Sequence, residues 1–291
     1  MNSKFAVFIL SNNRSEKVKT YKVLRESGYT GKIFIILDDR DKSIESYKAK
    51  FKKEEIVVFN KTEAMNLTDT ADNTSNDKAV VYARNMCWKI AKEKGLDNFL
   101  VLDDDYTGFD YRSNDKDEYT YKKVNRLDSV FKSFTDFLNN TNIKCIALAQ
   151  GGDFIGGKEG TFGKKIFLSR KCMNSFFCRT DRPFEFYGLI NEDVNCYVLN
   201  GSRGEVYFTS SLVSLNQTQT QANDGGLTTI YLELGTYVKS FYSVLYHPSS
   251  VVVEEMSTTH KRLHHKIYKD YSYPKIIRED YKKVLNVSSN V

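Results

Sequence analysis

The chain has 291 residues and a formal net charge of +6, with 41% hydrophobic and 27% charged residues. These proportions are those of an ordinary globular protein, and they exclude wholesale disorder and fibrous repeats. The length allows one large domain or two small ones, with a core that needs no disulfide or metal to stabilise it. The small positive excess suits a polyanionic partner, but solvated basic faces are also common.

Cysteine usage and hydropathy indicate the compartment. Five cysteines, an odd number without a CxxC pair, predict buried reduced thiols. The apolar run at residues 5–10 is too short for a signal-peptide core, and no stretch approaches the roughly 20 apolar residues of a membrane span. We therefore expect a cytoplasmic protein with no membrane span.

The first half alternates apolar strands with periodic helices. Strands are expected at residues 5–10, 32–37, 56–59 and 98–102, helices at residues 18–27 and 79–94, and a polar mobile loop at residues 65–77. Repeated strand–helix units predict an α/β fold, with a doubly wound, mostly parallel sheet flanked by helices.

The second half is less regular. Helices are expected at residues 127–138, 172–177, 192–199 and 236–246, and strands at residues 145–149, 166–169, 204–212 and 250–255. Polar residues 217–226 predict a flexible loop or lid. Because there is no internal repeat and no linker, we expect a main domain over residues 1–225, with a C-terminal extension over residues 226–291 packed on it.

Three polar clusters directly follow predicted strands. They comprise Ser11, Asn12 and Arg14 after the first, Asp38 and Asp39 after the second, and Asp103, Asp104 and Asp105 after the fourth. Ligands of doubly wound sheets bind beyond the carboxyl ends of the strands. The three clusters therefore predict a binding site along one rim of the sheet.

The acidic triplet at residues 103–105 has the chemistry of a metal site. Adjacent carboxylates repel one another unless a cation neutralises them. Mg²⁺ and Mn²⁺ are hard cations that carboxylate, water and phosphate oxygens hold together. An acidic turn is the alternative interpretation, but the position directly after an apolar strand favours a metal.

Two motifs stand on either side of a predicted helix: Ala83-Arg84-Asn85 at its start and Leu102-Asp103-Asp104-Asp105 after the strand that follows it. Their order resembles the "ARN … LDxD" block of GT-A-fold nucleotide-sugar glycosyltransferases. The resemblance implies that Asp103 faces the nucleoside and that Asp105 binds the metal, with Arg84 and Asp104 in the same donor site. It also implies that residues 11–14 form the nucleotide-binding loop and that Asp38 or Asp39 contacts the base.

Asn191-Glu192-Asp193 opens a predicted helix and looks like the Glu-Asp motif that supplies the catalytic base of inverting members. A carboxylate near a helix N-terminus is held ionised by the macrodipole and can accept a proton. An ordinary acidic helix start is the alternative. We expect Asp193 to be the base, with Glu192 as the second candidate.

A late basic segment, Arg262-Leu263-His264-His265-Lys266, is the last cluster. GT-A enzymes often supply a late histidine to the metal, which implies His264 as a ligand and Lys266 as a contact of the leaving diphosphate. A solvated basic stretch is the alternative.

Four motifs follow one another along the chain: LDDDY, GGDFIGG at residues 151–157, NED and RLHHKI. This layout also resembles the phage-type DNA-base glycosyltransferases associated with TET/JBP-like hydroxylases. That resemblance implies transfer from a nucleotide sugar, most readily a UDP-sugar, with Mn²⁺ or Mg²⁺. The acceptor would be a hydroxymethylated pyrimidine in DNA, in the host cytoplasm if a phage encodes the protein. Basic residues expected to contact DNA phosphates are Lys122, Lys123, Arg126, Lys158, Lys164, Lys165, Arg170 and Lys171.

Other functions stay open. The acceptor of a glycosyltransferase could instead be a glycan, a lipid or a protein. A sugar nucleotidyltransferase would share the fold and metal site, but it needs a glycine-rich phosphate loop after the first strand, and residues 11–19 contain no glycine. A non-catalytic nucleic-acid- or glycan-binding module would explain the charge, but not the acidic motifs at element ends.

Overall fold

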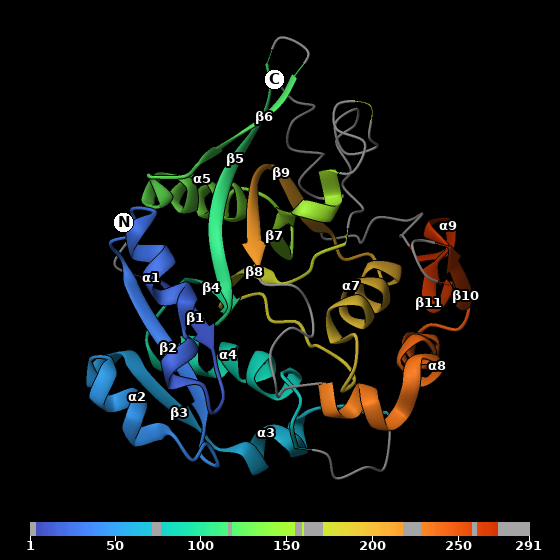
Figure 1. Cartoon of the computed structure of the whole chain (residues 1–291), viewed down its shortest axis with the longest axis horizontal. Helices are drawn as coiled ribbons and strands as arrows, with labels where there is room; N and C mark the ends of the chain where they lie inside the picture. Colours follow the sequence, from blue (N-terminus) through green and yellow to red (C-terminus); the bar gives the residue numbers. More distant parts are fainter. Residues whose placement is uncertain are drawn as a thin grey trace, which may run out of the picture.

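The computed structural model describes residues 4–71, 77–115, 118–154, 159, 171–217, 228–257 and 261–272. A nine-stranded sheet with the order β3-β2-β1-β4-β8-β7-β9-β5-β6 forms its centre (Figure 1). Its strands are β1 (Phe5–Leu10), β2 (Lys32–Asp38), β3 (Ile56–Phe59), β4 (Asn98–Asp103), β5 (Tyr106–Asp115), β6 (Glu118–Lys123), β7 (Cys145–Gln150), β8 (Ser175–Arg179) and β9 (Tyr207–Gln217). The pairing makes β8 and β5 antiparallel to their neighbours, while the other strands share one direction.

Helices cover both faces of this sheet. One face packs against α1 (Lys19–Glu26), α2 (Ile44–Lys50) and α5 (Leu127–Asn139), and the other against α3 (Lys61–Leu67), α4 (Val81–Glu93) and α7 (Glu192–Ser202). Successive side chains of β1 alternate between the two faces, so that Phe8 packs in one core cluster and Val7 in the other. The expected α/β fold, with a mostly parallel sheet flanked by helices, is confirmed.

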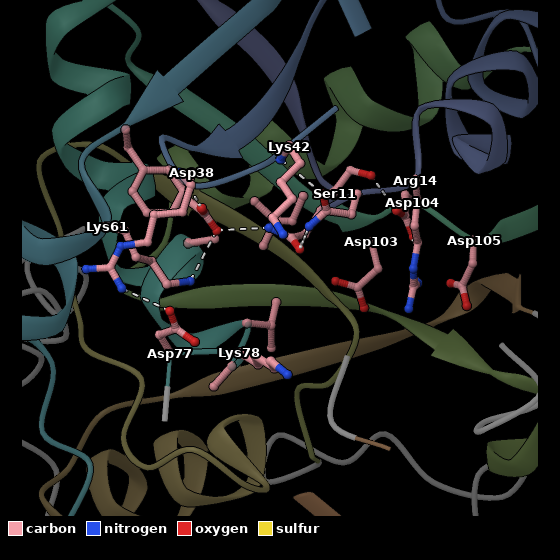
Figure 2. Close-up of a pocket in the computed structure, with 18 residues that line it drawn as sticks. Ser11, Arg14, Asp38, Lys42, Lys61, Asp77, Lys78, Asp103, Asp104 and Asp105 are labelled. Carbon is pink, nitrogen blue, oxygen red and sulfur yellow. Dashed lines mark hydrogen bonds and ion pairs between the residues drawn. The ribbon is translucent and has the colours of Figure 1, made fainter. Parts of the chain in front are cut away.

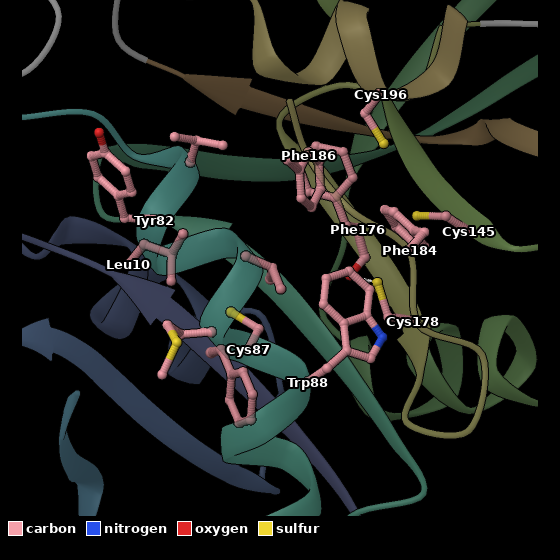
Figure 3. Close-up of a cluster of buried hydrophobic side chains, with 14 of the residues drawn as sticks. Leu10, Tyr82, Cys87, Trp88, Cys145, Phe176, Cys178, Phe184, Phe186 and Cys196 are labelled. Carbon is pink, nitrogen blue, oxygen red and sulfur yellow. Dashed lines mark hydrogen bonds between the residues drawn. The ribbon is translucent and has the colours of Figure 1, made fainter. Parts of the chain in front are cut away.

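An aromatic cluster joins α4 to the segment that follows β8 (Figure 3). The ring of Trp88 lies 4.6 Å from that of Phe184 and 5.4 Å from that of Phe99, both edge to face. Such pairs stabilise a core beyond the area they bury. All five cysteines are free and buried, as their odd number and spacing predict.

The register of the parallel strands aligns their carboxyl ends. Leu10 pairs with Asp103 of β4, and Asp38 pairs with Phe59 of β3. The polar residues that follow β1, β2 and β4 therefore meet at one edge of the sheet, as the pattern of strand ends predicts.

Two predictions about local structure are wrong. Residues 172–177 are not a helix, because Ser175 begins β8 and pairs with Leu102 in an antiparallel ladder. The expected loop at residues 65–77 is wrong only over residues 65–67, which belong to α3, and its residues 72–76 lie outside the described residues. The Asn60 side chain caps this helix by accepting a hydrogen bond from the Glu63 amide at 2.7 Å.

The hairpin of β5 and β6 and the helix α2 have no counterpart among the predicted elements. The hairpin extends beyond the rest of the sheet in Figure 1. The expected strand at residues 166–169 and all but the first residue of the expected loop at residues 217–226 lie outside the described residues.

A smaller unit follows the large sheet. It contains α8 (Thr228–Tyr246), which is kinked at Gly235 (φ 72°), the hairpin of β10 (Val251–Ser257) and β11 (Lys261–Ile267), and α9 (Lys269–Ser272). α8 packs against both strands of this hairpin and against α7. None of the helices in the described part of the chain has the length and apolarity needed to cross a membrane.

Candidate active site

A pocket of about 700 Å³ opens at the carboxyl edge of β1, β2 and β4 (Figure 2). Residues of all three predicted polar clusters line it, together with residues that begin α3 and precede α4. Five acidic and five basic side chains belong to the lining. This mixture suits a ligand that brings both an anion and a cation to the protein.

The loop after β1 is held by the middle carboxylate of the acidic triplet. Ser11 donates a hydrogen bond of 2.5 Å to Asp104, and the guanidinium of Arg14 lies 3.5 Å from the same carboxylate. Asp104 is 5% exposed. Burial raises its pKa to about 6, against the opposing effects of Ser11 and Arg14. Asp104 therefore fixes the shape of the loop after β1.

The structure separates the two aspartates that follow β2. Asp38 lines the pocket and accepts hydrogen bonds from Asn12 at 3.0 Å and from Lys61 at 3.2 Å. Asp39 is not among the lining residues. Its carboxylate binds the Lys61 amide and the Asn60 side chain, both at 3.0 Å. Of the two, Asp38 is therefore the residue that can contact a ligand in the pocket.

Lys61 is a pocket residue that the sequence patterns did not indicate. Its ammonium is buried between the Asp38 carboxylate and the ring of Tyr82, 4.9 Å from the ring centroid. The one sequence signal is its position two residues after the third strand. A lysine there would be expected in solvent, because lysine is rarely buried unless it is paired.

The first and third aspartates of the triplet face the pocket. The side chain of Asp103 is 30% exposed and accepts a hydrogen bond of 3.2 Å from Tyr106. Burial and the negative charge of Asp103 raise the pKa of Asp105. In the described part of the chain, His, Cys, Asp and Glu form no group of three that could hold a metal alone. Two hard carboxylates that repel each other nevertheless fit a divalent cation completed by phosphate and water oxygens.

Arg84 of α4 connects this triplet to the Asn191-Glu192-Asp193 motif. Its guanidinium forms a short ion pair with Glu192 and lies 3.4 Å from Asp103. The same group also packs over the rings of Phe176 and Phe186, 5.0 and 5.6 Å from their centroids. The two motifs are 89 residues apart in sequence (192 − 103), and Arg84 brings them together in space.

The motif at the start of α7 is buried and anchored. Asn191 adopts a left-handed conformation (φ 55°) and donates hydrogen bonds to the Lys239 carbonyl of α8 at 2.8 Å and to Ser243 at 3.3 Å. Asp193 is 8% exposed and accepts a hydrogen bond from the Val194 amide at 2.7 Å. Burial raises the pKa of Asp193, while the charge of Arg84 acts in the opposite direction. A buried carboxylate with a raised pKa has the properties of a general base.

The late basic cluster lies on β11. The ring of His264 contacts the His265 carbonyl at 2.8 Å, and Lys266 pairs with Glu254 of β10 at 2.7 Å. Neither His264 nor Lys266 lines the pocket. A role of His264 as a metal ligand, and of Lys266 at the diphosphate, stays a prediction from the sequence.

The expected basic surface is described in part. Lys122, Lys123 and Arg126 are exposed, and Lys171 lies 3.4 Å from Asp153. Lys158, Lys164, Lys165 and Arg170 lie outside the described residues.

Comparison with solved structures finds proteins determined in complex with UDP. Glucosyl-3-phosphoglycerate synthase from Mycobacterium tuberculosis, solved with Mg²⁺ and UDP, is 8% identical with a TM-score of 0.47, over 91% of this chain and 87% of that chain. TarS residues 1–349 from S. aureus, solved with UDP, is 14% identical with a TM-score of 0.43, over 73% of this chain and 59% of that chain. A search of curated protein sequences finds no match.

The sequence profile described as TET-Associated Glycosyltransferase matches residues 5–226. The match runs from β1 through β9 and includes every residue named above that lines the pocket, as well as Arg84 and the start of α7. Because this profile covers most of the chain and all of these residues, the chain belongs to the TET-associated glycosyltransferases and is a glycosyltransferase.

Proposed function

We propose that this glycosyltransferase moves a sugar from a nucleotide-sugar donor, in the first instance a UDP-sugar, to the hydroxyl of a hydroxymethylated pyrimidine in DNA, with inversion at the anomeric carbon. The observation that carries this proposal is the contact of Arg84 with both Asp103 and Glu192. A donor pocket and a carboxylate able to act as base then lie on either side of one buried guanidinium.

The donor would bind along the pocket rim. Asp103 and Asp105 would hold Mn²⁺ or Mg²⁺ together with diphosphate oxygens. When bound, the cation would neutralise the charge that develops on the leaving diphosphate. Arg14, Lys42 and Lys78 also line the pocket and add positive charge around the same ligand.

Asp193 would act on the acceptor. Its carboxylate takes the proton of the acceptor hydroxyl as that oxygen bonds to the anomeric carbon, while the bond from this carbon to the diphosphate oxygen breaks. The nucleoside diphosphate leaves with the bonding electron pair. Glu192 is committed to its ion pair with Arg84 and would position α7, so Asp193 is the better candidate for the base.

The β5–β6 hairpin supports DNA as the acceptor. Tyr121 on β6 is 70% exposed, and the guanidinium of Arg112 lies 5.2 Å from its ring centroid. Lys122 and Lys123 are exposed beside it. Aromatic rings and arginine planes stack on bases, and lysines contact phosphates. The target base would have to leave the stack to reach a donor held in a pocket.

Transfer of a labelled sugar tests the proposal directly. The protein is incubated with labelled UDP-glucose or UDP-N-acetylglucosamine, Mn²⁺, and duplexes that contain hydroxymethylcytosine, hydroxymethyluracil or unmodified pyrimidines. We expect label on hydroxymethylated DNA alone, and none with Asp193→Asn. Label on glycans or lipids but never on DNA would replace the acceptor. Formation of nucleotide sugar from a nucleoside triphosphate and a sugar 1-phosphate would replace the reaction class.

A further inference from the structure

Asn191, the residue before the two carboxylates of α7, directs its side chain away from its own helix. An asparagine at a helix N-cap ordinarily accepts a hydrogen bond from one of the first helical amides. The Asn191 side chain forms no such bond in the described structure, and the Asp193 carboxylate accepts from the Val194 amide instead. The Asn191 side chain is therefore available to hold α7 against another part of the chain.

The side-chain partners of Asn191 belong to the C-terminal unit formed by α8, β10, β11 and α9. Its Nδ2 donates to the Lys239 carbonyl at 2.8 Å and to the Ser243 hydroxyl at 3.3 Å, both on α8, and lies 3.5 Å from Nδ1 of His265 on β11. α8 itself packs against α7 (Figure 1). These partners follow residue 226, where the match to the family profile ends. A part of the chain beyond the family match therefore holds the start of the helix that carries the candidate base.

The backbone conformation of Asn191 depends on this support. Its φ of 55° lies in the left-handed region, which residues other than glycine rarely occupy, whereas the backbone at an N-cap is ordinarily extended. Such a conformation persists only where the surrounding structure imposes it. The hydrogen bonds to α8 are the contacts that impose it here, and they set the direction in which α7 begins.

Tyr242 of α8 makes a second connection, to the segment that leads into α7. Its hydroxyl accepts a hydrogen bond from the Leu189 amide at 3.4 Å and donates one to the Thr70 carbonyl. Its ring packs against Gly188, where a Cβ would lie 2.6 Å from a ring carbon. The Gly188 amide donates to the Asp69 carbonyl at 2.8 Å. Because Tyr242 is 4% exposed, it fixes this segment firmly against the loop that follows α3.

These connections act directly before Asp193. Glu192 joins α7 to Arg84, and Asn191 joins it to α8, so two consecutive residues are fixed from different sides. A general base has to lie within hydrogen-bond reach of the proton that it takes. Because an error of about 1 Å in such a position can slow a reaction about 100-fold, the support of this turn bears directly on catalysis.

We propose that the C-terminal unit positions the catalytic base, with Asn191 and Tyr242 as positioning residues that act through Asp193. This inference rests on the proposed role of Asp193 as the base. Loosening α8 from the start of α7 then slows the transfer of the sugar and leaves the binding of the nucleotide unchanged. Binding is unaffected because the described residues that line the donor pocket include none from the C-terminal unit.

Asn191→Gly tests the first connection, because glycine adopts the left-handed conformation freely and only the side chain is lost. Single-turnover transfer of labelled sugar from a UDP-sugar, to the acceptor that the wild-type protein labels, is expected to fall about 10- to 100-fold. The affinity for UDP with Mn²⁺, measured by calorimetry, is expected to stay unchanged. A purely structural role would instead lower the fraction of protein that binds UDP.

A double-mutant cycle shows whether Asn191 acts through the base. In Asp193→Asn the group to be positioned is gone, so adding Asn191→Gly is expected to change the residual transfer rate little. Equal slowing of transfer with and without the Asp193 carboxylate would mean that Asn191 acts on something else.

Tyr242→Phe tests the second connection and keeps the inference falsifiable if Asn191→Gly does not fold. It removes the bridging hydroxyl but keeps the ring, and it is expected to slow transfer with UDP affinity retained. Tyr237→Phe is the matched control, because Tyr237 lies on the same helix, is 55% exposed and stacks on Phe241. The control is expected to transfer sugar at the wild-type rate.

The outcomes separate this inference from the function on which it rests. Wild-type transfer by both Asn191→Gly and Tyr242→Phe, with transfer lost in Asp193→Asn, overturns the positioning role and leaves the base in place. Full transfer by Asp193→Asn overturns the proposed base and the positioning role with it. Transfer to a glycan or a lipid but not to DNA overturns the proposed acceptor alone. Absence of transfer by the wild-type protein to any acceptor overturns both the function and the inference.

Discussion

Arg84 on α4 forms an ion pair with Glu192, the first residue of α7, although 108 residues separate them in the chain. The side chains are 3% and 7% exposed. The same guanidinium lies 3.4 Å from Asp103, at the end of β4. One buried cation therefore fixes the position of the candidate base relative to the donor pocket.

Removing Arg84 is expected to destabilise the protein strongly. Arg84→Met leaves Glu192 buried without its partner, and breaking such a pair costs about 3–5 kcal/mol. Urea unfolding of the variant measures this loss. Lys89→Met on the same helix removes an exposed pair with Glu63 and is expected to change the unfolding free energy little. Equal effects of the two variants would contradict the structural role of Arg84.

The two carboxylates of α7 are expected to differ in kinetics. Asp193→Asn removes the proposed base but keeps the shape, so transfer is expected to fall by about 10²- to 10⁴-fold with donor affinity retained. Glu192→Gln weakens the pair with Arg84 and is expected to lower the unfolding free energy as well. Single-turnover transfer and donor titration measure both effects. Loss of transfer in Glu192→Gln alone would move the base to residue 192.

Removing the metal and removing the Asp105 carboxylate are expected to have the same effect, which is weaker binding of the nucleotide. Asp105→Asn and EDTA treatment of the wild-type protein should each weaken binding of UDP, because the diphosphate loses its cation. Adding EDTA to Asp105→Asn should then change little more. Asp136→Asn, on the exposed surface of α5, is the control and should keep the full response to Mn²⁺. Undiminished Mn²⁺-dependent binding by Asp105→Asn would exclude Asp105 as a ligand.

His265 is expected to make the protein acid-sensitive. Burial lowers its pKa to about 4, and the charges of His264, Lys239 and Lys171 act in the same direction. Its Nδ1 lies 3.5 Å from the side-chain Nδ2 of Asn191, an arrangement that suits the neutral ring. The unfolded chain takes up this proton near pH 6.5, whereas the folded protein does so only near pH 4. Stability linked to His265 is therefore complete above about pH 6.5 and is lost as the pH falls toward about 4.

The size of this acid effect can be measured by substitution. A depression of this size corresponds to at most about 3 kcal/mol between about pH 7 and pH 4. Urea unfolding of wild type and His265→Gln across this range isolates the contribution from that of the carboxylates. The variant is expected to lose less stability on acidification. Parallel curves for the two proteins would mean that His265 is protonated alike in both states.

DNA binding is expected to depend on salt and on the β6 lysines. Lys122→Glu with Lys123→Glu should weaken binding to hydroxymethylated DNA. It should also lower the slope of log affinity against log salt by about one for each phosphate that is no longer neutralised. Filter binding over a salt series measures both. Lys48→Glu with Lys50→Glu on α2, two lysines that pair with Glu45 and Glu16, is a charge-matched control. A salt slope that the double variant leaves unchanged would place the DNA elsewhere.

Local sequence patterns were sufficient to predict the strand-and-helix alternation and the rim of the sheet. Apolar runs that end in polar clusters are local signals, and parallel strands bring their ends to one edge, so the pocket around Ser11, Asp38 and Asp103 follows from pattern alone. The same local signals failed at β8, where a short apolar segment is compatible with either a helix or a strand, and only its pairing with β4 distinguishes them.

Packing between distant segments determined which polar residues act together. Lys61 looks like an ordinary charged residue in sequence, and the family resemblance marks Arg84 without naming its partners. The contacts of both arise because the fold buries them against Asp38 and Glu192. Asp39 has the same chemistry as its neighbour Asp38 but is turned to the start of α3. Burial and ion pairing depend on residues distant in the chain, which no local pattern contains, so only the folded chain could assign these roles.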